Sequence, residues 1–280
     1  AYTYRLCVSK DPDNKIPFLK PAGYDENEFE LLFRIFEAGD ERLPLKIEPL
    51  PNNKYDINSL HSFSTDGAML NWRFPTGDYA TRAQIIERQT KYEQGIIWTL
   101  ANHPRVPRAI RDEVSQYGLA KDEFIRNGGW PYEIYIREAR RMVSDYVMTQ
   151  HHAEGSIEVN DPVAEASFGM DSHVVQMFIN EEGHVHREGV IWRVPPRPYG
   201  ISYRSIVPKI GETENLFVPV CLSASHVAHG SIRMEPQFMM LGQAAALAAV
   251  MGIHEQVAVQ HINYEQLAEL IKEHNEGFVF

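Results

Sequence analysis

Apolar residues recur every three or four positions in several stretches of the chain, which is the pattern of a helix with one buried face. The spacing predicts helices over residues 26–38, 81–101 and 263–280. A shorter helix is predicted to begin at Pro107 and to end at Gly118. The pattern assigns packing to these helices and no chemistry.

Alternation of apolar and polar residues marks the predicted strands. It predicts strands over residues 1–8, 45–50 and 174–179, from Val185 onward, and over the short apolar run 216–220. We expect an α+β fold with an antiparallel or mixed sheet and a helical insertion near residues 81–118. We expect three parts, namely residues 1–80, 81–150 and 151–280.

The stretch from Ser223 to Gly252 combines several features in one place. A loop with two His and one Arg leads into a helix whose first turn holds Pro236, and Gly252 can end that helix. The middle of the helix, Gly242–Ala249, is almost entirely small residues. Such a helix can approach a flat ligand closely, or it can pack as a buried Ala-rich helix against a sheet. The spacing alone favours the packing interpretation.

Composition narrows the function classes. The chain has 280 residues, of which 44% are hydrophobic and 23% charged, as in ordinary soluble globular proteins. Its formal net charge of −11 argues against nucleic acid or an anionic membrane surface as the main partner. We expect no apolar run of membrane-spanning length. Composition gives no cellular location.

The sequence gives little support for a metal site or for a disulfide framework. Cys7 and Cys221 make neither a disulfide framework nor a metal-ligand spacing. His184 and His186 alternate on a predicted strand without a third ligand, so exposed histidines on a strand edge are the favoured interpretation. The pair His151–His152 receives the same interpretation. We therefore predict no metal site.

Four further motifs carry a family resemblance. They are Glu133-Ile-Tyr-Ile-Arg-Glu-Ala-Arg-Arg-Met-Val143, Ala166-Ser-Phe-Gly-Met-Asp-Ser-His173, Tyr199-Gly-Ile-Ser-Tyr-Arg-Ser-Ile-Val-Pro208 and the stretch from Ser223 to Gly252. Together they resemble FAD-dependent oxidoreductases related to the fumarate reductase flavoprotein class, from Tyr2 to about Gly252. The chain departs from the family pattern at Ser202, Ala246 and Pro219-Val-Cys-Leu-Ser223.

The resemblance implies a fragment of a two-domain flavoprotein fold that transfers a hydride between a small-molecule substrate and FAD. It implies that the substrate is held or protonated by Arg204, His226, Tyr203 and Arg137. It implies that the flavin is lined by Ser223, Ser225, Arg233, Gly242 and Gln243. Each of these residues also has a plain structural interpretation, such as a core Tyr, a surface Arg or a charged helix face.

The dinucleotide fingerprint Gly-x-Gly-x-x-Gly, which the family carries near its N-terminus, does not occur in these 280 residues. We therefore expect an excised fragment that contains no FAD by itself, although the intact protein would bind it. Strands at residues 1–8 and 215–220 would then expose edges, which predicts self-association.

Two other classes stay open at this point. A carbohydrate lyase abstracts a proton beside a uronate carboxylate, and Tyr203, Arg204 and His226 supply suitable residue types. A non-catalytic binding module would suit a chain without a nucleotide half. A flavin absorption band from the intact gene product separates the first class from both of these. Release of an unsaturated uronate product separates the lyase from the binding module.

Overall fold

The computed structural model describes residues 1–61 and 63–275, which form two compact units. Unit 1 comprises Ala1–Ile136 with His173–Gly189, and unit 2 comprises Arg137–Ser172 with Val190–Phe280. The predicted division into residues 1–80, 81–150 and 151–280 stays a prediction. The described residues contain seven α-helices and only antiparallel strand ladders, so the predicted α+β class is confirmed.

Unit 1 is built on a five-stranded antiparallel sheet. The strands, in spatial order, are β2 (Lys15–Ile16), β5 (Gly118–Ala120), β1 (Leu6–Ser9), β4 (Lys54–Ser59) and β3 (Leu45–Leu50). The predicted strand at 45–50 is therefore confirmed. Asn52 and Asn53 join β3 to β4 with φ of 62° and 55°, a left-handed backbone that Asn tolerates better than most residues.

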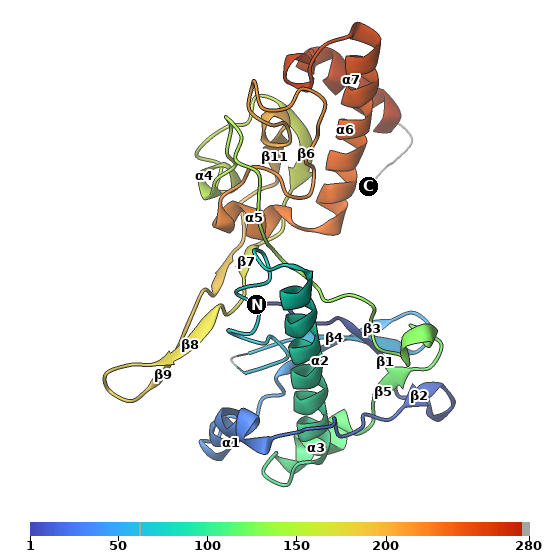
Figure 1. Cartoon of the computed structure of the whole chain (residues 1–280), viewed down its shortest axis with the longest axis vertical. Coiled ribbons are helices and arrows are strands. Elements are labelled where there is room, and N and C mark those ends of the chain that lie inside the picture. Colours follow the sequence, from blue (N-terminus) through green and yellow to red (C-terminus); the bar gives the residue numbers. More distant parts are fainter. Residues whose placement is uncertain (62, 276–280) are drawn as a thin grey trace. The chain divides into compact units, whose positions relative to one another are not determined.

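Helices of unit 1 cover the apolar face of this sheet. They are α1 (Glu30–Glu37), α2 (Tyr79–Asn102) and α3 (Arg108–Val114), and α2 lies across the strands in Figure 1. Val8 and Ile57 from the sheet join Ile96 and Phe33 from the helices in one buried core. Asp78 caps α2 by accepting a hydrogen bond from Thr81 N at 2.8 Å.

A two-stranded hairpin completes unit 1. Strand β8 (Gln176–Ile179) pairs with β9 (Val185–Glu188), as the alternation predicted. His184 and His186 are exposed. Among the described residues there is no group of three or more His, Cys, Asp or Glu side chains that could hold a metal ion.

Unit 2 contains two short antiparallel pairs and four helices. Strand β6 (Pro162–Ala166) pairs with β11 (Tyr199–Ser202), and β7 (Met170–Ser172) pairs with β10 (Ile191–Arg193). The helices are α4 (Gln150–Ala153), α5 (His226–Ile232), α6 (Glu235–Glu255) and α7 (Tyr264–Asn275). Helix α5 packs on β7, while α6 packs on β6 and on α7 (Figure 1).

Helix α6 differs from its prediction at the C-terminal end. It runs past Gly252 and ends at Gln256, whose φ of 56° supplies the left-handed cap. This 21-residue helix contains an 18-residue window with a mean hydropathy of 1.4, so by length and composition it could cross a membrane, contrary to the expectation that no such run exists. Leu241 and Ala248 on this helix are fully buried in the core of unit 2, as in the core helix of a globular protein.

One strand prediction is wrong, and a second is confirmed only in part. Residues 216–220 form no strand, because Pro219 has no N–H to donate and Val218 N makes a single backbone bond to Ile206 O. The strand predicted at 1–8 begins only at Leu6, and it has partners on both sides. The self-association that was predicted from exposed edges of these two segments stays a prediction.

Two helix ends also differ from the sequence prediction. Helix α3 ends at Val114, and Gly118 opens strand β5 instead of ending the helix. A Cβ at Gly118 would lie 2.3 Å from Ile16 O, so the close strand approach requires glycine there. Helix α7 ends at Asn275, and the rest of the predicted helix over 263–280 lies outside the described residues.

Candidate active site

Helix α5 is stabilised by a side-chain cap at its start and is bonded to strand β7 near its end. Ser225 caps the helix and accepts a hydrogen bond from Ala228 N. Near the other end, Arg233 Nη2 donates to Asp171 Oδ2 at 2.8 Å. Between these points a Cβ at Gly230 would lie 2.8 Å from Asp171 O, so only glycine permits this approach. The helix therefore presents its first residue, His226, at a fixed position beside β7.

His226 is held on both sides of its ring. Its Nδ1 lies 2.8 Å from Glu138 Oε2, and its Nε2 lies 3.0 Å from Ser172 Oγ. Arg141 Nη1 donates to the same Glu138 oxygen at 2.9 Å. The His226 side chain remains 40% exposed, whereas residue Ser172 is 6% exposed. All four residues belong to unit 2.

The charges around Glu138 keep it ionised. Burial by itself would raise the pKa of Glu138, but the hydrogen bond to His226 and the positive charges of His226 and Arg141 hold that pKa below its usual range. An ionised Glu138 only accepts hydrogen bonds, so neutral His226 carries its proton on Nδ1. The free lone pair on Nε2 then accepts from the Ser172 hydroxyl.

A second histidine on α5 is a contrasting case. Burial lowers the pKa of His229 to about 4, with a smaller effect from the charge of Arg141, so its ring is neutral at neutral pH. Its Nδ1 is buried without a partner among the described residues. His229 therefore belongs to the packing of α5 and not to the exposed cluster at His226.

Arg204 is held by a carboxylate that the sequence did not indicate. Its Nε and Nη2 both donate to Asp161 at 3.0 Å, in the parallel two-bond geometry typical of this pair. The guanidinium also lies 4.1 Å from the centre of the Tyr146 ring. Asp161 accepts from Ser202 Oγ as well, which makes it the centre of this second cluster.

This second cluster opens into a pocket of about 510 Å³ in unit 2. Arg204 and Asp161 line the pocket together with Tyr146, Asn160 and Tyr264. His226 is not among the lining residues. Of the two side chains, only Arg204 therefore lines this pocket.

The other two residues predicted to act on the substrate are enclosed. Tyr203 donates its hydroxyl to Val259 O at 2.6 Å, and burial raises its pKa. Arg137 is buried and already engaged in an interaction. Neither side chain offers a free group at the surface of unit 2.

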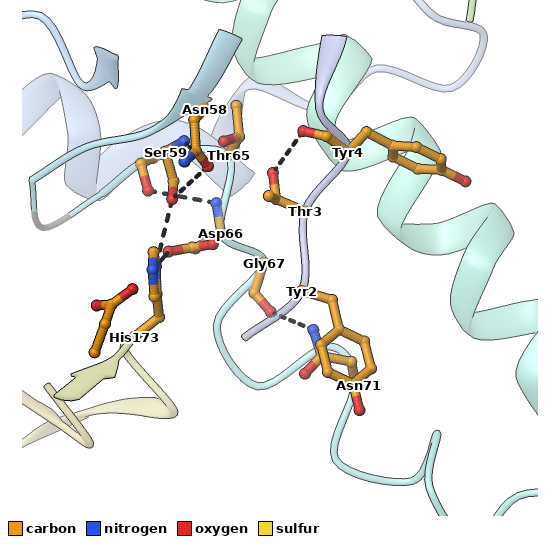
Figure 2. Close-up of polar contacts among 12 residues, drawn as sticks. Tyr2, Thr3, Tyr4, Asn58, Ser59, Thr65, Asp66, Gly67, Asn71 and His173 are labelled. Atoms are coloured by element: carbon orange, nitrogen blue, oxygen red, sulfur yellow. Dashed lines mark hydrogen bonds and ion pairs between the residues drawn. The ribbon is translucent and has the colours of Figure 1, made fainter. Parts of the chain in front are cut away.

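A third polar cluster lies in unit 1 around His173 (Figure 2). His173 Nδ1 lies 2.7 Å from Asp66 Oδ2 and 3.5 Å from Ser59 Oγ. Figure 2 shows the His173 ring turned toward both of these side chains. The motif Asp171-Ser-His173 thus gives each of its three residues a different polar contact.

Five residues were predicted to line a flavin, and the structure places them unevenly. Ser223 is fully buried and its Oγ accepts from Ser144 N, Ser225 caps α5, and Arg233 is buried against Asp171. Gly242 faces open space, and Gln243 donates to Asn275 Oδ1 at 3.2 Å. The first three are grouped around α5, and the last two are on α6.

Sequence reasoning missed Glu138, Asp161 and Ser172 as members of these clusters. All three are polar residues inside or close to the motifs described above. Taken by itself, however, each is typical of a surface or turn position. Only the fold brings Glu138 to His226, which is 88 positions away in the chain. A signal was present in Asp171-Ser-His173, where three polar residues follow an apolar strand position.

Comparison with protein-family models matched residues 1–271 to the family described as FAD dependent oxidoreductase. Comparison with curated proteins and with solved structures gave no match.

Proposed function

Because the chain belongs to the FAD-dependent oxidoreductase family, we propose that it takes part in hydride transfer between a small-molecule substrate and flavin, with His226 exchanging the substrate proton. The observation that carries the proposal is the His226 ring, held at 2.8 Å by Glu138 and still 40% exposed. An oriented, accessible imidazole is the most common proton-transfer group in enzymes. The family relation suggests an enzyme, and its name implies FAD.

Glu138 supports this role through charge. Its carboxylate fixes the Nδ1–H form of neutral His226 and would stabilise the imidazolium formed when Nε2 takes a proton. Arg141 balances the carboxylate and ties it to the loop before α5, because Arg141 Nε donates to Ala224 O at 3.0 Å. The ring thus meets a substrate in one orientation.

Arg204 suits the binding of an acidic group on the substrate. Asp161 uses two of its N–H bonds, and the side chain is still 52% exposed at the pocket described above. A guanidinium binds carboxylate in a planar geometry that lysine cannot reproduce. Because this pocket does not include His226, we assign the proton transfer to His226 alone and keep Arg204 as a separate candidate for binding an acidic group.

The residues predicted to line FAD do not, as they stand, form one surface for it. Ser223 and Arg233 are buried and bonded within the protein, so a flavin would meet neither without rearrangement. Gly242 leaves open space, where a Cβ would meet no atom within 4 Å. The flavin-lining set therefore stays a prediction, and we derive no reaction step through the flavin.

The lyase alternative loses its main candidate for the base. Tyr203 is 5% exposed and donates its hydroxyl to a backbone carbonyl, so it offers no free oxygen to a substrate. His226 remains an accessible base in unit 2. No observation in the described residues favours a uronate substrate over other acids.

The proposal is tested with the full-length gene product. Absorption spectra report whether flavin is bound, and anaerobic mixing with a panel of hydroxy acids, polyols and sugars reports which substrate bleaches the flavin band. A bleaching substrate supports the proposal. A protein that purifies without flavin, and does not take it up when FAD is added, contradicts it.

A further inference from the structure

We propose that Ser172 is an activated nucleophile in unit 2, with His226 as its base and Glu138 as the residue that orients the base, and that the site accepts the acyl group of a carboxylic ester. The activity goes beyond the proposed oxidoreductase function and needs no oxidant. It follows from the arrangement of three side chains contributed by three separate segments of unit 2.

The arrangement meets the geometric test for an activated hydroxyl. A weakly nucleophilic serine becomes reactive when its Oγ is hydrogen-bonded to a base that is itself oriented by a third group. Here Ser172 Oγ lies 3.0 Å from His226 Nε2, and His226 Nδ1 lies 2.8 Å from Glu138 Oε2. Each ring nitrogen therefore has the partner that its role requires.

The packing of α5 on β7 fixes the positions of the nucleophile and the base relative to each other. Ser172 is the last residue of β7, and His226 is the first residue of α5. Gly230 lets the two elements approach, and Arg233 bonds to Asp171 beside Ser172. A nucleophile and base on two packed elements keep their spacing better than two groups on loops.

Charge favours transfer of the proton from serine to histidine. Glu138 is ionised, as argued above, and Arg141 fixes it from the other side. The carboxylate stabilises the imidazolium that forms when His226 takes the Ser172 proton. Ser172 is 6% exposed and the His226 side chain is 40% exposed, so the cluster is in contact with solvent.

The reaction balances without a further reagent except water. Ser172 Oγ forms a bond to the ester carbonyl carbon while its proton passes to His226 Nε2. The bond from that carbon to the leaving oxygen breaks, and the leaving alcohol takes the proton from His226. Water then attacks the acyl-serine with the same base, which releases the acid and restores Ser172.

The test uses a fluorophosphonate probe, which forms a bond to an activated serine oxygen and releases fluoride. Wild-type protein is incubated with the probe, and the modified residue is identified by mass spectrometry. We expect modification at Ser172, and none there after unfolding in denaturant. His226→Gln should slow it on the order of 100-fold, in line with the loss of a general base. Glu138→Gln should also slow it.

A matched control keeps the result specific. His151 is an exposed histidine of α4, outside the cluster, so His151→Gln should label at the wild-type rate. Ser172→Ala should lose the label, and thermal unfolding shows whether each variant is folded. Should His226→Gln fail to fold, the wild-type site of modification and the rate of Glu138→Gln decide the question.

Absence of label at Ser172 in folded wild-type protein overturns the inference, as does an unchanged rate in folded His226→Gln or Glu138→Gln. The labelling requires no flavin. A protein that labels at Ser172 but reduces no flavin therefore supports this inference while it contradicts the proposed function.

Discussion

Gly230 and Asp171 approach each other more closely than any residue with a Cβ would allow. A Cβ at position 230 would lie 2.8 Å from Asp171 O and 3.0 Å from Asp171 N, and both of these atoms belong to backbone that cannot turn away. This contact holds helix α5 close against strand β7. It therefore sets the distance between His226 on the helix and Ser172 on the strand.

Gly230→Ala should destabilise unit 2 and separate the two side chains. The added methyl group forces helix and strand apart, and overpacking of this kind costs about 1–3 kcal/mol. Chemical denaturation measures the loss of unfolding free energy. An alanine variant as stable as wild type would show that α5 does not rest on β7 as described.

Gly242 provides the matched control, because a Cβ there meets no atom within 4 Å. Gly242→Ala in the middle of α6 should stabilise the chain by about 0.5–1 kcal/mol, the usual gain over glycine inside a helix. The same denaturation experiment measures both variants. A loss of stability in Gly242→Ala would contradict the open space at this position.

The open face at Gly242 also allows a test of the flavin prediction. Gly242→Leu should fold like wild type, since the described residues leave room for the side chain. In the full-length protein it should nevertheless block flavin binding, if flavin lies against this face as the family resemblance implies. Flavin retained at wild-type stoichiometry would remove Gly242 from the flavin site.

Glu93 should make unit 1 less stable as pH rises. It is fully buried, and burial raises its pKa well above the ordinary value of 4.5. The folded state then binds the proton more tightly than the unfolded state. Its contribution is fully present below about pH 4.5 and is lost as the pH increases through the raised pKa.

Two variants separate charge from hydrogen bonding at Glu93, which accepts from Tyr4 N and Gln89 Nε2. Glu93→Gln keeps an acceptor without a charge, so it should remove this pH dependence. Glu93→Leu leaves the Tyr4 N–H without a partner, at a cost of about 1–3 kcal/mol. Unfolding free energies measured across the pH range check both. An unchanged pH slope in Glu93→Gln would refute the assignment.

Arg204→Ala should lower turnover with little effect on folding. The side chain is half exposed, so its ion pair with Asp161 contributes about 1 kcal/mol or less. Asp161→Ala should cost more, because Asp161 also accepts from Ser202 Oγ and Arg204 N. A large loss of stability in Arg204→Ala, with turnover per folded molecule unchanged, would favour a purely structural role.

Periodicity and turn chemistry predicted most of the large elements. The helix expected at 81–101 is α2, and the hairpin expected after residue 174 is β8–β9. Such segments are decided by local spacing, which a sequence displays. The strand predicted at 216–220 does not form, because a strand needs a partner from elsewhere in the fold. Pro219 also lacks the backbone N–H with which it could bond to such a partner.

The candidate site was predicted only in part. The His226 loop was identified because unusual polar residues follow one another there. Glu138, Asp161 and Ser172 were not, since an isolated carboxylate or hydroxyl in a sequence does not reveal which distant side chain it meets. The predicted grouping of Arg204 with His226 assumed one pocket, whereas the pocket of Arg204 does not include His226.

The account is tested most directly by the rate at which substrate reduces the flavin of the full-length protein when His226 is replaced. Anaerobic stopped-flow absorbance measures this step by itself. We predict that His226→Gln retains its flavin but is reduced on the order of 100-fold more slowly, as expected for loss of a proton-transfer group. Reduction of the folded variant at the wild-type rate would contradict the central assignment.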